Sequence, residues 1–141
     1  NYQKMKTFKC NFYILFLLIL PLIFGSCCLA RVQVHIINRL PDGMPMTLHC
    51  QSHDNDLGQL RLTGGDEASW TFSVNFWGTT MFYCDAQWDN SSMTYRFITY
   101  DASRDTRRCQ TECWWMISEE ETLYGYNQES EYWELFPFTS A

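Results

Sequence analysis

Two histidines stand four residues apart, next to groups that bind metal ions in other proteins. His49 and His53 flank Cys50, and Asp54 and Asp56 follow. On a helix, this spacing would bring both imidazoles to one face, where they could bind zinc. The residues around His49 instead alternate in hydropathy as a strand does, and His53 falls in the turn that follows. The sequence therefore predicts no metal site and no cofactor, and it assigns Cys50 to a disulfide.

The segment 54–58 resembles a calcium loop only superficially. Its sequence, Asp-Asn-Asp-Leu-Gly, lacks the spaced carboxylates and the closing bidentate glutamate of such a loop. Asp and Asn side chains accept hydrogen bonds from their own backbone, and glycine tolerates positive φ. These residues predict a rigid turn.

The sequence contains no motif that points to catalysis. A nucleophile elbow, a phosphate-cradling glycine loop and an HExxH pair are all absent. The acidic run of Glu119, Glu120 and Glu121 is typical of a solvated surface turn. We therefore predict a protein that is not an enzyme.

A second hypothesis is a secreted carbohydrate-binding module or a small extracellular hydrolase, because carboxylate pairs of the glycosidase type leave no sequence signature. For this hypothesis, exposed aromatic side chains would stack on sugars. The candidates are Trp77, Trp115 and Trp133.

The first thirty residues differ from the rest of the chain. Three lysines (Lys4, Lys6 and Lys9) precede an uncharged apolar run at 12–24, and small residues follow near 26–30. This order predicts a secretory signal peptide over 5–30, since a membrane span needs roughly 20 apolar residues. Residues 1–4, before the first methionine, are predicted to lie upstream of the translated protein. Cleavage after Ala30 is favoured over cleavage after Cys28, and it leaves residues 31–141 as one secreted domain with no membrane insertion.

Residues 31–141 are strongly acidic. They keep all 16 Asp and Glu residues and only seven basic residues, every one arginine, for a net charge of −9. Nucleic acids and anionic membranes both require a basic surface, so the charge argues against either partner. An acidic surface favours a basic patch on another protein.

Four cysteines follow the predicted signal peptide: Cys50, Cys84, Cys109 and Cys113. An even number in a small secreted domain predicts two disulfides, and three pairings are open. Bridges that close long loops remove more entropy from the unfolded chain. On that ground we favour Cys50–Cys113 with Cys84–Cys109.

Short segments of alternating hydropathy recur about every ten residues, each followed by a turn. They predict strands at 31–38, 46–52, 59–63, 69–74, 79–88, 93–100 and 113–117, with shorter strands at 123–126 and 131–136. Residues 101–108 are expected to form a charged loop. Seven to nine strands joined by short turns predict an all-β fold, an antiparallel β-sandwich of two sheets. In the turn at 89–92, Asn90 begins an N-glycosylation sequon, and we expect a glycan there.

An ordered set of cysteines, aromatic residues and turn residues runs through about residues 32–126. Its members are His49, Cys50, Ser52, Asp54, Asp56, Leu57, Gly58, Trp70, Phe72, Asn75, Trp77, Gly78, Thr80, Phe82, Tyr83, Cys84, Trp88, Phe97, Tyr100, Asp101, Cys109, Cys113 and Trp114. In this order they resemble the plant self-incompatibility S-protein homologues, named for the stigma S proteins of poppy. The segment 118–122 departs from the family pattern, in which an acidic residue and a glycine form the turn.

The resemblance implies a small, secreted, disulfide-bonded β-sandwich that acts as an extracellular signalling ligand. In the poppy members, a pistil protein meets a pollen membrane receptor, and recognition of self stops the pollen tube. We therefore expect a monomeric ligand of a cell-surface protein receptor, with binding residues on its turns. The predicted receptor-facing residues are Asp54, Asn55, Asp56, Asp101, Arg104, Asp105, Arg107, Arg108, Glu119, Glu120 and Glu121.

Overall fold

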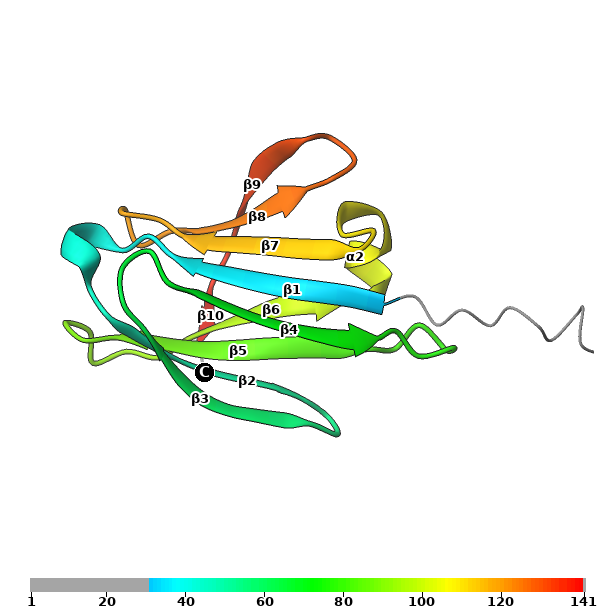
Figure 1. Ribbon diagram of the computed structural model, residues 1–141, viewed down its shortest axis with the longest axis horizontal. Helices are drawn as coiled ribbons and strands as arrows, with labels where there is room; N and C mark the ends of the chain where they lie inside the picture. The colour runs from blue at the N-terminus through cyan, green and yellow to red at the C-terminus, as the bar shows by residue number, and fades with distance from the viewer. Residues whose placement is uncertain (1–30, 141) are drawn as a thin grey trace, which may run out of the picture.

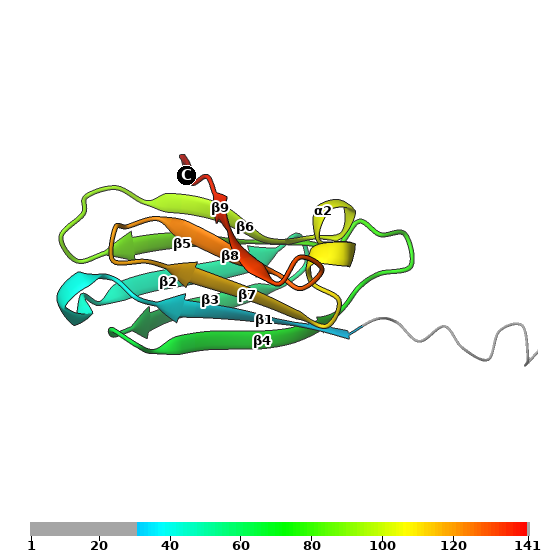
Figure 2. The ribbon, with the colours of Figure 1, turned by 90° about the horizontal axis from the view of Figure 1, so that it is seen from above.

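The computed structural model describes residues 31–140, and the predicted signal peptide lies outside this range. Two five-stranded sheets pack against each other (Figure 1, Figure 2). The first contains, in spatial order, β4 (Glu67–Ser73), β1 (Arg31–Asn38), β7 (Glu112–Ile117), β8 (Leu123–Asn127) and β9 (Tyr132–Phe136). The second contains β10 (Thr139–Ser140), β6 (Tyr95–Asp101), β5 (Met81–Trp88), β2 (Met46–Ser52) and β3 (Asp56–Leu62). The predicted all-β sandwich is confirmed.

Alternating side chains fill the space between the sheets, as the period of two predicts. From β1, Val32, Val34 and Ile36 are buried. Trp88 and Trp115 are also fully buried, and the indole nitrogen of Trp115 donates a hydrogen bond of 2.8 Å to the carbonyl of Thr99. These two tryptophans are the largest fully buried side chains of the described core.

One strand pair departs from the antiparallel prediction. β1 and β7 run parallel, with Val34 opposite Cys113, whereas β1 pairs with β4 antiparallel. Alternation along a strand specifies which side chains are buried, but it does not specify which strand lies beside it. The parallel pair therefore left no signal in the hydropathy pattern.

The predicted loop at 101–108 is instead a short helix, α2 (Ala102–Arg108). Asp101 caps it, because its carboxylate accepts a 2.8 Å hydrogen bond from the backbone N–H of Ser103. A 3₁₀ turn, η1 (Pro41–Gly43), follows β1. Among residues 31–140, no helix has both the length and the apolar character needed to cross a membrane.

The two disulfides join Cys50 to Cys84 and Cys109 to Cys113, so the favoured pairing was wrong. Cys50 and Cys84 lie directly opposite each other on β2 and β5, with Cα atoms 4.0 Å apart. The second disulfide links the end of α2 to the start of β7. Strand register determines the first pair, and the short connection between α2 and β7 determines the second.

Connections gather at two ends of the sandwich (Figure 1). At one end, called the α2 end, lie the 53–55 turn, the 74–80 loop, α2 and the 128–131 turn. At the other, called the η1 end, lie η1 and the connections at 63–66, 89–94 and 118–122. Every predicted receptor-facing residue lies at one end or the other.

Candidate functional site

The two histidines of the suspected metal site bind different carboxylates. His49 Nε2 lies 2.7 Å from Asp56, and His53 Nδ1 lies 2.7 Å from Asp54. Within the described range, no three His, Cys, Asp or Glu side chains group so as to hold a metal ion. The pair at 49 and 53 therefore does not converge on a common point.

The 53–55 turn is rigid and carries exposed charges. The hydroxyl of Ser52 accepts a 3.1 Å hydrogen bond from the backbone N–H of Asn55, and Asp56 accepts one of 2.8 Å from Gly58. The Gly58 N–H, followed by the His49 imidazole, holds the pKa of Asp56 below its ordinary value. The hydrogen bond to Asp54 raises the pKa of His53. The side chains of Asp54 and Asp56 are both exposed, so both can contact a partner.

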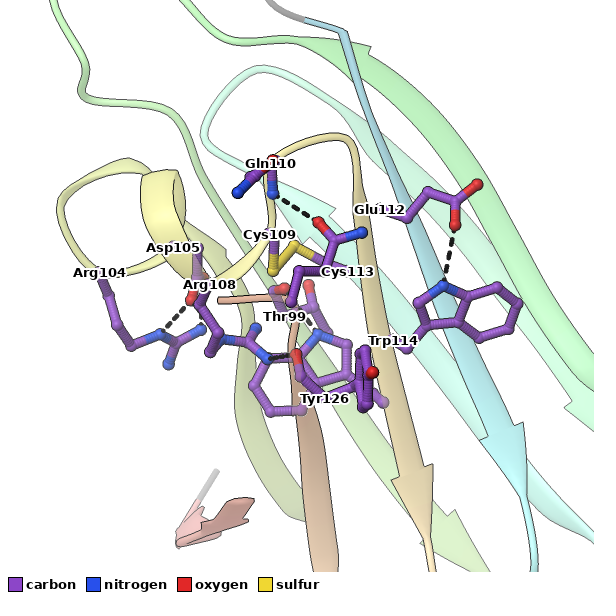
Figure 3. The surroundings of a disulfide bond; sticks show 12 residues. Thr99, Arg104, Asp105, Arg108, Cys109, Gln110, Glu112, Cys113, Trp114 and Tyr126 are labelled. Carbon is purple, nitrogen blue, oxygen red and sulfur yellow. Dashed lines mark hydrogen bonds and ion pairs between the residues drawn. A yellow bond between two sulfur atoms is a disulfide. The ribbon is translucent and has the colours of Figure 1, made fainter. Parts of the chain in front are cut away.

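Asp105 was predicted to face a receptor, but it is completely buried. Its carboxylate accepts hydrogen bonds of 2.8 Å from the Nε atoms of Arg104 and Arg108. It also accepts one of 2.8 Å from the backbone N–H of Asp101. Figure 3 shows this carboxylate between the two arginines, beside the disulfide. Asp105 therefore joins the first turn of α2 to its two arginines, and it cannot touch a partner.

Arg108 is buried for the same structural purpose, so it too is removed from the receptor-facing set. Its guanidinium lies 4.3 Å from the ring centroid of Trp115 and donates a 3.0 Å hydrogen bond to the carbonyl of Tyr126 (Figure 3). Burial lowers its pKa, and the Asp105 carboxylate opposes that shift. Of these two adjacent arginines, both predicted to face a receptor, only Arg107 is exposed.

The remaining predicted residues divide between opposite ends of the molecule. Arg104 binds Asp105 and the carbonyl of Ile98, and Asp101 caps α2. The acidic run lies at the η1 end, where Glu120 accepts a 2.7 Å hydrogen bond from the hydroxyl of Ser118. This bond lowers the pKa of Glu120. No single flat surface can therefore contact all the charged turns at once.

The most exposed aromatic side chains lie in the 74–80 loop. Phe76 is 75% exposed and Trp77 is 81% exposed, and their rings meet edge to face with centroids 5.4 Å apart. Trp77 is one of the predicted sugar-stacking residues, whereas Phe76 is not. The sequence does carry a signal for both residues. Two aromatic residues stand next to each other, which breaks the alternation expected of a strand, and a glycine follows at 78, as in a turn.

The three tryptophans proposed for sugar stacking do not share a surface. Trp115 is buried, which removes it. Trp133 lies on β9 and Trp77 follows β4, and these strands are the opposite edges of one sheet.

Two hollows lie on the side of the sandwich where β3 and β4 form the sheet edges. The larger, of about 580 Å³, is lined by Asp54, Asn55, Asn75 and Thr79, among others. The smaller, of about 240 Å³, is apolar and is lined by residues that include Leu57, Leu60, Ala68 and Trp70. Only the larger hollow adjoins charged turn residues.

Asn90, the predicted glycosylation site, is exposed in the turn after β5. This position is accessible to a transferase, and its occupancy stays a prediction.

Comparison with known proteins matches most of the described chain. Residues 33–137 match the family described as "Plant self-incompatibility protein S1". The chain is 38% identical over 126 residues to "Self-incompatibility protein S1" of Papaver rhoeas, and the alignment covers 89% of both chains. It is 35% identical over 98 residues to "S-protein homolog 20" of Arabidopsis thaliana, covering 67% of this chain and 71% of that one.

A solved structure shares the fold. It is described as a Self-Incompatibility Protein Homologue, from "a widespread family of small, highly stable, secreted proteins from plants". The TM-score is 0.57 at 15% identity, covering 82% of this chain and 96% of that chain. The chain therefore belongs to the plant self-incompatibility protein S1 family of small secreted proteins.

Proposed function

We propose that this protein is a secreted, non-catalytic ligand recognised by a protein receptor at a plant cell surface. The observation that carries the proposal is the 38% identity to the poppy self-incompatibility protein S1 over 89% of both chains. A match of that extent includes the core and the turns together. In the proposal, the protein acts as a monomer and its receptor contacts lie on the turns.

The exposed charges support a protein partner. Asp54, Arg107 and Glu119 remain exposed after the buried members of the predicted set are removed. The net charge of −9 over residues 31–141 favours a basic surface on the receptor. Binding through such charges accelerates association and makes it sensitive to salt.

The surroundings of the histidines support a non-catalytic role. His35 Nδ1 lies 2.5 Å from Glu67, and its ring stacks on Trp114 at 3.8 Å. His49 and His53 bind Asp56 and Asp54. Each imidazole therefore contacts a carboxylate rather than a hydroxyl or thiol nucleophile, and the three sites are separate.

The test applies refolded protein of residues 31–141, with free thiols counted by mass spectrometry, to growing pollen tubes from several genotypes. We expect the protein to arrest the growth of pollen tubes of some genotypes and to leave the growth of others unchanged. Uniform growth in the presence of fully oxidised, folded protein would contradict the pollen-recognition form of the proposal.

Charge reversal on the exposed turns separates recognition from folding. We expect Asp54→Lys to reduce arrest at least tenfold in potency, because the new cation repels the basic surface of the receptor. We expect Arg107→Glu to reduce it to a similar extent, because in the proposal Arg107 pairs with a carboxylate within that otherwise basic surface. Both side chains are exposed, so the melting temperature should stay within a few degrees of that of the wild type. Full potency in both variants would show that neither turn contacts the receptor.

A further inference from the structure

We propose that Phe76 and Trp77 form the anchor of the receptor contact, inserting together into an apolar pocket on a protein partner whose rim is basic. The inference rests on the proposed function and names the surface that performs it. It adds an apolar component to a site that otherwise consists of charged turns.

Hydrogen bonds fix the loop before any partner arrives. The side-chain amide of Asn75 donates a hydrogen bond of 2.8 Å to the hydroxyl of Thr79. Its side-chain oxygen accepts a hydrogen bond of 2.9 Å from the backbone N–H of Thr79. The hydroxyl of Thr80 accepts a hydrogen bond of 2.8 Å from the backbone N–H of Asn75. Gly78 completes the turn at φ 65°, in the left-handed region that favours glycine. A loop held in this way loses little conformational entropy on binding.

The two rings contribute little to the folded core. At 75% and 81% exposure, Phe76 and Trp77 keep most of their surface in water. Their main contact is with each other, at an interplanar angle of 82°. Large aromatic side chains on a rigid loop are the residues that most often dominate the energy of a protein interface.

The shape of the pair favours a protein pocket over a sugar. Sugar rings stack on flat aromatic faces, whereas these two rings are nearly perpendicular and do not form one platform. A perpendicular pair on a loop presents a wedge, and the complement of a wedge is a concave apolar pocket.

Charge around the loop specifies the rim of that pocket. The 580 Å³ hollow beside the loop is lined by Asp54 and Asn55 as well as by Asn75. Asp101 also lies close, because the next residue, Ala102, donates its backbone N–H to the carbonyl of Thr80 at 3.0 Å. Arg31, opposite Ser73 in the sheet, is a nearby cation, and His53, which also lines the hollow, is hydrogen-bonded to Asp54. Asp54, Asp101 and Asp56, two residues after Asp54, outnumber these two basic groups. A basic rim matches this surface, and the same charges repel anionic lipid.

The decisive experiment measures binding of fluorescently labelled protein to intact pollen cells that respond to it. We expect the double variant Phe76→Ser with Trp77→Ser to bind about 100-fold more weakly, since two anchor residues at an interface each contribute strongly. Its melting temperature should equal that of the wild type because both rings are exposed. Wild-type affinity in the double variant would overturn the inference.

A matched control uses exposed apolar residues elsewhere. Tyr132 and Leu135 on β9 are 55% and 68% exposed and lie at the opposite edge of the sheet from β4. We expect Tyr132→Ser with Leu135→Ser to change affinity less than threefold. An equal loss in both double variants would show non-specific hydrophobic adhesion and would overturn the inference.

Four further measurements test the partner's chemistry. Protease treatment of the cells should abolish binding, and Asp54→Lys should weaken it and reduce its salt dependence. Binding of wild-type protein, lost in the double variant, to phosphatidylcholine vesicles would identify a membrane partner and overturn the inference. The same result with soluble pectin or glucan would identify a glycan partner and also overturn it.

The proposed function and the anchor fail in different ways. Absence of saturable binding by the wild-type protein to any pollen genotype would contradict both. The double variant at Phe76 and Trp77 could instead bind as tightly as the wild type, saturably and in a protease-sensitive way. That result would leave the receptor proposal in place and contradict the anchor alone.

Discussion

Asp54 and Asp105 show how burial divides identical side chains between recognition and folding. The Asp54 side chain is 84% exposed, so its charge is available to a partner. Asp105 is buried between two guanidiniums, and removing it would leave a buried cation without its counter-charge. Variants at 105 or 108 therefore report on stability, and they are unsuitable for mapping a receptor contact.

A strained residue in the 118–122 turn gives the first prediction on stability. Glu121 adopts φ 56°, a left-handed conformation that costs a residue with a Cβ about 1 kcal/mol or more. We expect Glu121→Gly to raise the free energy of unfolding by about 1 kcal/mol, measured by urea denaturation. Glu119, which precedes it in the same turn, has no positive φ, so Glu119→Gly is the control and should not stabilise. A loss of stability in Glu121→Gly would contradict the assignment of strain.

This turn also explains a departure noted in the sequence. The family pattern places glycine in the turn, and here Glu121 takes a glycine-type conformation instead. Ser118 and Thr122 close the turn through a 2.9 Å backbone hydrogen bond, so β7 and β8 still pair. The turn geometry is kept although the residue that favours it is absent.

At the scale of elements, alternation predicted the strands well and the helix not at all. The expected strands at 31–38 and 46–52 match β1 and β2 at both ends. The seven residues of α2 are too few for a helical hydropathy period. The sequence signal for α2 lies in its capping residues. The Asp101 carboxylate accepts a hydrogen bond from the backbone N–H of Ser103, and the Asp105 carboxylate accepts one from the backbone N–H of Asp101. Reciprocal capping of this kind predicts a helix start where periodicity cannot.

The candidate site was predicted in part for a similar reason. Turn positions can be read from the sequence, so the exposed charges of Asp54, Arg107 and Glu119 were placed on the surface. The burial of Asp105 and Arg108 depends on which strands α2 packs against, and that contact is tertiary. The exposure of Phe76 likewise depends on the Asn75 hydrogen bonds, which hold its ring away from the core.

The disulfides give a prediction at the same scale. Cys50 and Cys84 are 34 residues apart, and Cys109 and Cys113 are four apart. Loop-closure entropy then predicts losses of about 4 kcal/mol for Cys50→Ala with Cys84→Ala and about 2 kcal/mol for Cys109→Ala with Cys113→Ala. Chemical denaturation of the two double variants measures both values. A larger loss from the short loop would show that entropy is not the dominant contribution.

At the scale of the whole molecule, the carboxylates determine the response to acid. Hydrogen bonds lower the pKa of Asp101, chiefly from the hydroxyl of Ser103, and that of Asp66, chiefly from Thr63. A carboxylate whose pKa is lower in the folded state stabilises the protein at every pH above its unfolded-state pKa, which is near 3.8 for Asp. This contribution is lost as the pH falls through the folded-state pKa. We expect the free energy of unfolding to fall steeply below about pH 4.

Urea denaturation across a pH series tests this expectation. Asp101→Asn keeps a good helix cap but removes one titrating group, so its decline below pH 4 should be shallower. A variant curve parallel to that of the wild type throughout would show that Asp101 does not contribute.

The parallel pairing of β1 with β7 has a consequence for how the chain folds as it is made. Gln33 pairs with Glu112, so one side of the first described strand waits for residues synthesised much later. Contacts of such long sequence separation slow folding. Until β7 arrives, β1 presents an unpaired strand edge, and such edges pair readily with other chains. Nascent chains that stall before residue 112 should therefore be the species most prone to aggregate.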